Sequence, residues 1–159
     1  MNLLELLITV LFLAVLSASV FAPSEPTIGL SQHAASALDN TLFAAAASAQ
    51  RIPDGVTVIV KPDGALGSVV TTYAGRPDGA QGYLADEKTI TQPIALTGNV
   101  TTFALAVSPD GSAEVISPYS TWAAAAAGGT ACSALTGTVG AGTISLPVTI
   151  DCASMRVTF

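Results

Sequence analysis

The chain has 159 residues, which suits one domain preceded by an N-terminal segment. Half of its residues are hydrophobic, a tenth are charged, and the formal net charge is -6. Phosphate binding needs clustered Lys and Arg, so this balance argues against nucleic acid as a main partner. The five basic residues are scattered along the chain: Arg51, Lys61, Arg76, Lys88 and Arg156.

The chain begins with an apolar run. Residues 6–22 carry no charge, and Glu5 stands directly before them. A helix over residues 1–22 would span roughly 33 Å, enough to cross the hydrocarbon core of a bilayer. A cleaved signal peptide would normally begin with positive residues, and a plain membrane anchor would normally have basic residues near one end. In a third hypothesis Met1 is a mature N-terminus, and its α-amino group supplies the positive charge that Glu5 lacks.

The stretch "MNLLELLITVLFLAVL" resembles the mature N-terminus of type IV pilins and pseudopilins. That family has an apolar or aromatic residue at position 1, a polar one at 2, two aliphatic ones at 3 and 4, a glutamate at 5, and a proline near 22. This chain departs from the pattern where Met1 replaces the commonest Phe and Ala14 replaces a common Gly, and it shows no cationic leader. The matching positions are Met1, Asn2, Leu3, Leu4, Glu5 and Pro23.

The resemblance implies a two-part molecule. Residues 1–26 would form a hydrophobic stem helix, a membrane anchor before assembly and the filament core afterwards, and residues 27–159 a globular head. The stem would unwind in part between Ala14 and Pro23. Glu5 would face the α-ammonium of Met1, which family members usually carry methylated, in the same chain or in a neighbouring copy. An inner-membrane leader peptidase and a pilus assembly machinery would be the other partners.

After Pro23 and Pro26 an amphipathic pattern predicts a helix over residues 27–52. Apolar residues recur every three or four positions and form one stripe, Ser31 is a plausible N-cap, and Pro53 ends the helix. His33 is expected to be an exposed helix residue, because no acid, thiol or second histidine accompanies it. The stripe consists of Leu30, Ala34, Leu38, Leu42, Ala45, Ala49 and Ile52.

Residues 53–159 show strand runs and turns. "PDG" occurs four times, starting at Pro53, Pro62, Pro77 and Pro109, and its residue types suit turns better than calcium loops. Short links predict mostly antiparallel pairing, with a hairpin around Pro109. The stretch after Thr121, "WAAAAAGGTAC", could be a short helix or a packed loop. The expected strands are 55–61, 67–74, 100–108, 112–118, 142–150 and 155–159.

Two cysteines, Cys132 and Cys152, are too few for a structural zinc site and predict one disulfide in an oxidising compartment. Two free buried thiols are the alternative. The expected fold class is therefore α+β: a long N-terminal helix packed on a mostly antiparallel sheet, with a disulfide joining the C-terminal strands.

We find none of the common catalytic motifs in the chain: no Gly-x-Ser-x-Gly, no Cys–His pair, no P-loop and no metal-ligand cluster. We therefore expect no enzymatic activity, cofactor or metal, although Asp86 and Glu87 make a weak cation candidate. The leading hypothesis is a structural subunit that forms an extracellular pilus-like filament from a membrane-inserted pool. The alternatives are a minor pilin or a type II secretion pseudopilin, and a membrane-anchored binding domain that uses its sheet or the Trp122 loop.

Overall fold

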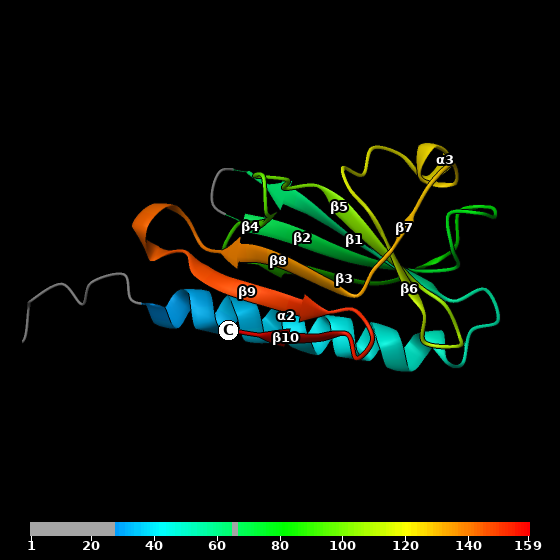
Figure 1. Cartoon of the computed structure of the whole chain (residues 1–159), viewed down its shortest axis with the longest axis horizontal. Coiled ribbons are helices and arrows are strands. Elements are labelled where there is room, and N and C mark those ends of the chain that lie inside the picture. The colour runs from blue at the N-terminus through cyan, green and yellow to red at the C-terminus, as the bar shows by residue number, and fades with distance from the viewer. Residues whose placement is uncertain (1–27, 65–66) are drawn as a thin grey trace, which may run out of the picture.

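The computed structural model of the chain describes residues 28–64 and 67–159 (Figure 1). This part is α+β, with one main helix, α2 (Ile28–Ala49), and strands in two sheets whose pairs are all antiparallel. In Figure 1, α2 runs in blue and cyan along the lower side of the strands, next to β9 and β10. The short helices are α3 (Trp122–Ala125) and the 3-10 turn η1 (Gly142–Ile144).

The larger sheet has six strands and the smaller sheet four. The order in the larger sheet is β3 (Leu84–Ile90), β2 (Gly67–Ala74), β1 (Val56–Asp63), β5 (Phe103–Val107), β6 (Ala113–Ile116) and β7 (Thr130–Ala131). The order in the smaller sheet is β10 (Arg156–Thr158), β9 (Leu146–Asp151), β8 (Ala134–Val139) and β4 (Ile94–Leu96).

The main core lies between α2 and the two sheets, because α2 contacts strands of both. Strand β1 shows how the sequence builds it: Val56, Val58 and Val60 alternate with Thr57 and Ile59 and belong to the main core. The apolar stripe of α2 packs against them, and full burial of a Leu contributes about 1.5–3 kcal/mol. The buried stripe residues are Ala34, Ala35, Leu38, Leu42, Ala45 and Ala49.

A second, smaller core covers the other face of the larger sheet. It contains Ile59, Ala104, Ala106 and Ile116 from the strands, and Tyr119, Trp122 and Ala125 from α3 and the segment before it. Trp122 begins α3, whose N-cap Thr121 accepts a hydrogen bond from the Ala124 backbone N–H. The stretch that sequence analysis left open between helix and loop is therefore a single helical turn packed on the sheet.

The expected architecture of one long N-terminal helix on one sheet is wrong. The described helix is Ile28–Ala49, 22 residues long, and the strands form two sheets. The helix ends before Ile52 because the chain turns from Gln50 onward and Pro53 disfavours helical backbone at the residue before it. Ser31 is not an N-cap but lies inside α2, and its hydroxyl donates to the Ile144 carbonyl at 2.8 Å.

Of the predicted hairpin turns, one is confirmed and one is shifted. The hairpin of β5 and β6 is confirmed: Ser108 and Gly111 close the turn around Pro109, and Gly111 has a positive φ of 85°. Strand β1 extends two residues beyond its expected end at Lys61, because Pro62 and Asp63 still pair with β2. Sequence analysis missed four strands, namely β3, β4, β7 and β8.

Candidate assembly surface and disulfide-bounded segment

The residues proposed for assembly and stem flexibility, Met1, Glu5, Ala14 and Pro23, lie outside the described residues. Their roles stay predictions. What the structure describes is the domain that follows this segment in the chain, together with the exposed surface of that domain.

Large apolar side chains are exposed at two places on α2 and at the residue that follows β10. Leu30 and Phe43 are 51% and 52% exposed, and Phe159, just after β10, is 54% exposed. The Arg156 guanidinium lies 5.1 Å from the centre of the Phe43 ring, a cation–π distance. Phe43 and Arg156 therefore form one exposed ring–cation pair, which we call the helix-side surface.

Asp39 fixes the C-terminal strand to α2. Its carboxylate accepts hydrogen bonds from Arg156 Nε at 2.9 Å, Arg156 Nη2 at 2.8 Å, and the Val157 backbone N–H at 2.7 Å. Asp39 is buried, whereas the Arg156 side chain is 53% exposed. The bidentate pair orients the guanidinium that lies over Phe43.

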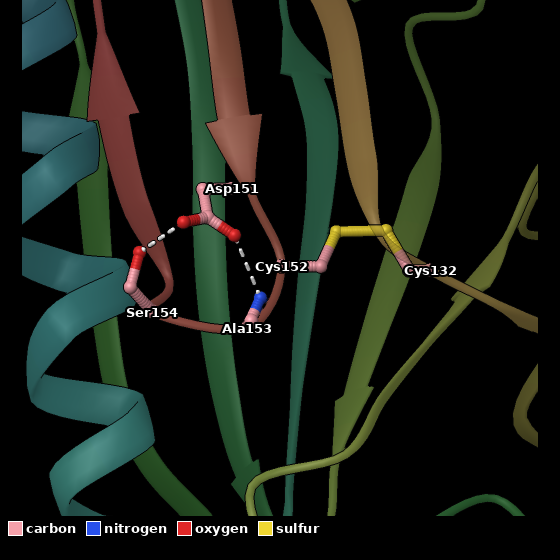
Figure 2. The surroundings of a disulfide bond; sticks show 5 residues. All are labelled: Cys132, Asp151, Cys152, Ala153 and Ser154. Carbon is pink, nitrogen blue, oxygen red and sulfur yellow. Dashed lines mark hydrogen bonds between the residues drawn. A yellow bond between two sulfur atoms is a disulfide. The ribbon is translucent and has the colours of Figure 1, made fainter.

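The Cys132–Cys152 disulfide is present, as the cysteine count predicted (Figure 2). The two Cα atoms are 5.8 Å apart, and the bond joins residues 20 positions apart. Cys132 follows β7 and Cys152 follows β9, so the bond links an edge of the larger sheet to the smaller sheet. Backbone hydrogen bonds from Cys132 to Ala113 and from Cys152 to Ser133 hold the same junction.

Asp151 organises the turn that follows the disulfide. Figure 2 shows its carboxylate accepting from the Ser154 hydroxyl at 2.8 Å and the Ala153 backbone N–H at 3.0 Å. These two hydrogen bonds lower the pKa of Asp151, the Ser154 hydroxyl having the larger effect. The turn also holds Met155 at a positive φ of 51° before β10 begins.

A hollow of about 780 Å³ lies beyond the C-terminal end of α2, lined by residues 52–54, 74–76 and 78–83 together with Pro109. The cation at this hollow, Arg76, already pairs with Glu114 at 2.7 Å and hydrogen-bonds to Ser108. An open hollow whose cation is already neutralised offers little to select a ligand.

The weaker sequence candidates have plain structural roles. His33 is exposed on α2, as expected. Asp86 and Glu87 are neighbours on the edge strand β3, so they point to opposite faces of the sheet and do not converge on a cation. Trp122 is only 8% exposed, and its indole N–H donates to the Gly79 carbonyl at 3.1 Å. The Trp122 side chain is therefore part of the smaller core, while residues 126–131 after it are exposed.

Sequence reasoning missed Asp39, Arg156 and Phe43. Asp39 and Arg156 lie 117 positions apart, and no local pattern pairs them. The available signal was a carboxylate at the border of the apolar stripe of α2, since such a group requires a partner when it is buried.

Comparison with protein-family models, curated proteins and solved structures finds no match to this chain. Over residues 28–64 and 67–159, no three His, Cys, Asp or Glu side chains are grouped as a metal site would require. None of the helices in the described part has the length and apolar character needed to span a membrane.

Proposed function

We propose that the chain is the structural subunit of a type IV pilus-like filament and polymerises through its apolar N-terminal segment. The observation that carries the proposal is the placement of Glu5, a lone carboxylate directly before the uncharged residues 6–22. A carboxylate is costly inside a bilayer, by about 2.5–3.5 kcal/mol on insertion scales for Asp at a helix centre. The presence of Glu5 at the start of this apolar segment therefore indicates that its carboxylate has a specific cationic partner.

The partner we propose is the α-ammonium that a leader peptidase would leave on Met1. No Lys or Arg occurs before Arg51, so the apolar run offers no other cation. A buried ion pair is often neutral in net stability, because desolvation of both groups offsets their attraction. We therefore propose that this ion pair sets the register of assembly: a subunit joins only where its N-terminus lies next to the Glu5 side chain of a neighbouring copy.

Assembly would then exchange one apolar environment for another. The N-terminal segment would be stored in lipid and withdrawn to pack against the same segments of neighbouring copies, held by van der Waals contacts. A division of labour is supported by the described residues, which build two apolar cores and a disulfide among themselves.

Glu5→Gln and Glu5→Ala, each expressed as the only subunit, test the proposal. We expect normal membrane insertion and a loss of filaments by about tenfold or more, scored by negative-stain microscopy of sheared surface material. Glu87→Gln is the matched control, since Glu87 is exposed on β3 and should leave filaments unchanged. N-terminal sequencing of sheared filaments should start at Met1.

Each of the other experimental outcomes would favour a different role for the chain. Abundant filaments of normal symmetry from Glu5→Ala would refute the role of the charge. Wild-type chain found only as membrane monomer would favour an anchored binding domain. A few copies within filaments of another subunit would favour a minor pilin or pseudopilin.

A further inference from the structure

One turn of the smaller sheet carries a motif that the proposed function does not use. Of three asparagines in the chain, Asn2, Asn40 and Asn99, the last alone begins an Asn-X-Thr pattern, Asn99-Val100-Thr101. The middle residue is not proline, as acceptor sites for N-linked glycans require. Asn40 is followed by Thr41 and Leu42 and lacks the hydroxyl residue two positions on.

The structure places this motif on a projecting turn between β4 and β5. Asn99 and Thr101 are exposed, while Val100 between them is partly buried. Asn99 has a positive φ of 60°, a conformation that asparagine tolerates better than most residues. A Cβ placed on the neighbouring Gly98 would meet nothing within 4 Å, so the tip of the turn faces open space.

The base of the turn is anchored while its tip is free. The Leu96 N–H donates to the Val100 carbonyl at 2.9 Å, and the Thr97 N–H donates to the Thr136 carbonyl at 3.0 Å. The Thr97 and Thr136 hydroxyls are 2.8 Å apart. A bulky group on the Asn99 side chain would therefore extend into solvent without disturbing a strand.

The cellular compartment that the disulfide indicates is also one in which N-glycans are attached. The Cys132–Cys152 disulfide is typical of proteins that mature outside the cytosol, where N-glycans are found on surface loops of exported chains. This argument needs export only, and it holds whether or not the chain forms filaments.

We infer that Asn99 is an N-glycosylation site, with a lipid-linked diphosphate oligosaccharide as the donor. The side-chain amide nitrogen would attack the anomeric carbon of the first sugar and form a C–N bond. The bond from that carbon to the phosphate oxygen breaks, the diphosphate leaves with the electron pair, and the amide nitrogen gives up one proton to a base of the transferase. The Thr101 hydroxyl completes the pattern that the transferase recognises.

Mass spectrometry of the chain purified from its native host tests the site. After reduction and trypsin digestion, the peptide of residues 89–156 contains Asn99 and no other asparagine. We expect its mass to exceed the sequence mass by one or more sugar residues. Asn99→Asp should abolish the increment with little disturbance of the turn, because aspartate also tolerates positive φ but lacks the amide nitrogen. Thr101→Ala should abolish it as well.

Three variants should keep the increment: Thr101→Ser, which preserves the hydroxyl, Thr102→Ala beside the motif, and Asn40→Gln on α2. An unmodified 89–156 peptide in native material would overturn the inference. So would an increment that persists in Asn99→Asp, because the sugar would then be attached elsewhere, for example to a Ser or Thr hydroxyl.

Discussion

Asp39 ties the C-terminal strand β10 to helix α2 through three hydrogen bonds, two from Arg156 and one from the Val157 backbone N–H. The backbone bond matters most for stability, because Val157 is buried and its N–H would lose its partner without the carboxylate. An unsatisfied buried donor costs about 1–3 kcal/mol. The Arg156 side chain is half exposed, so water can replace part of what it loses.

We therefore predict that Asp39→Ala lowers the free energy of unfolding by about 2 kcal/mol, within the range for an orphaned buried donor. Asp39→Asn should cost less, since its carbonyl can still accept from Val157. Urea denaturation of residues 28–159 measures both, and Asp54→Ala, an exposed carboxylate after α2, is the control. Equal stability of Asp39→Ala and the parent would show that β10 does not depend on this contact.

Asp151 gives the turn before β10 a dependence on pH. The Ser154 hydroxyl and the Ala153 N–H hold the pKa of Asp151 below its ordinary value. In acid the unfolded chain therefore binds a proton before the folded chain does. The stability from these bonds is complete above the ordinary carboxyl pKa, near 3.9, and is lost as the pH falls through the lower folded pKa.

We predict that Ser154→Ala raises the pKa of Asp151 toward its ordinary value, because the larger of the two stabilising hydrogen bonds is removed. Carboxyl-carbon NMR titration would measure the change directly. Ser48→Ala is a suitable control, because that hydroxyl bonds to the Ala44 carbonyl and faces no carboxylate. An unchanged Asp151 titration in Ser154→Ala would mean that the Ala153 N–H alone sets the pKa.

Such contacts mark the limit of sequence reasoning for single residues. Ser31 has a residue type and position that suit a helix cap, yet its hydroxyl bonds to the Ile144 carbonyl, 113 positions away. Asp39 and Arg156 likewise meet only through the fold. The cysteine pairing was predictable for a different reason: a chain with two cysteines allows a single intramolecular disulfide.

Among the elements, the strands that sequence predicts are those with a buried face and clear turn residues. Strands β1, β2 and β5 are rich in Val, Ile and Ala and border Pro-Asp-Gly turns, so their pattern is visible. Strand β3 contains Asp86, Glu87 and Lys88 and is exposed over nearly its whole length. Its charges protect the sheet edge from pairing with other chains, and the same charges hide it from pattern analysis.

At the level of elements, we predict that the double variant Cys132→Ala/Cys152→Ala loses on the order of 3 kcal/mol of stability. Opening the cross-link restores conformational freedom to the unfolded chain over a 20-residue separation. Denaturant titration with and without reductant would measure the loss, and reduced wild type should approach the variant. The unreduced parent should be two hydrogens lighter by mass spectrometry; two alkylatable thiols in native material would contradict this pairing.

For the whole molecule, the α+β content and the antiparallel pairing follow from the sequence, whereas the expected long helix on a single sheet is wrong and the split into two sheets was not predicted. The split depends on β4 and β8, whose paired residues are 41 to 45 positions apart, and neither has a strong strand pattern: β4 has three residues and β8 contains Gly137. The proposed assembly role rests on Glu5 and the residues around it, which the described part does not include.

Removal of residues 1–27 tests whether folding is independent of the segment proposed for assembly. The described residues supply two cores, two sheets and a disulfide, so we expect the fragment of residues 28–159 to fold without the N-terminal segment. We predict a soluble monomer with an α+β circular dichroism spectrum and one cooperative unfolding transition, in place of the filaments expected of the full chain. Sedimentation velocity would test the monomer and thermal melting the transition. If the fragment instead unfolded without cooperativity, the N-terminal segment would be part of the folding unit, and loss of filaments on deleting it would no longer argue for a separate role in assembly.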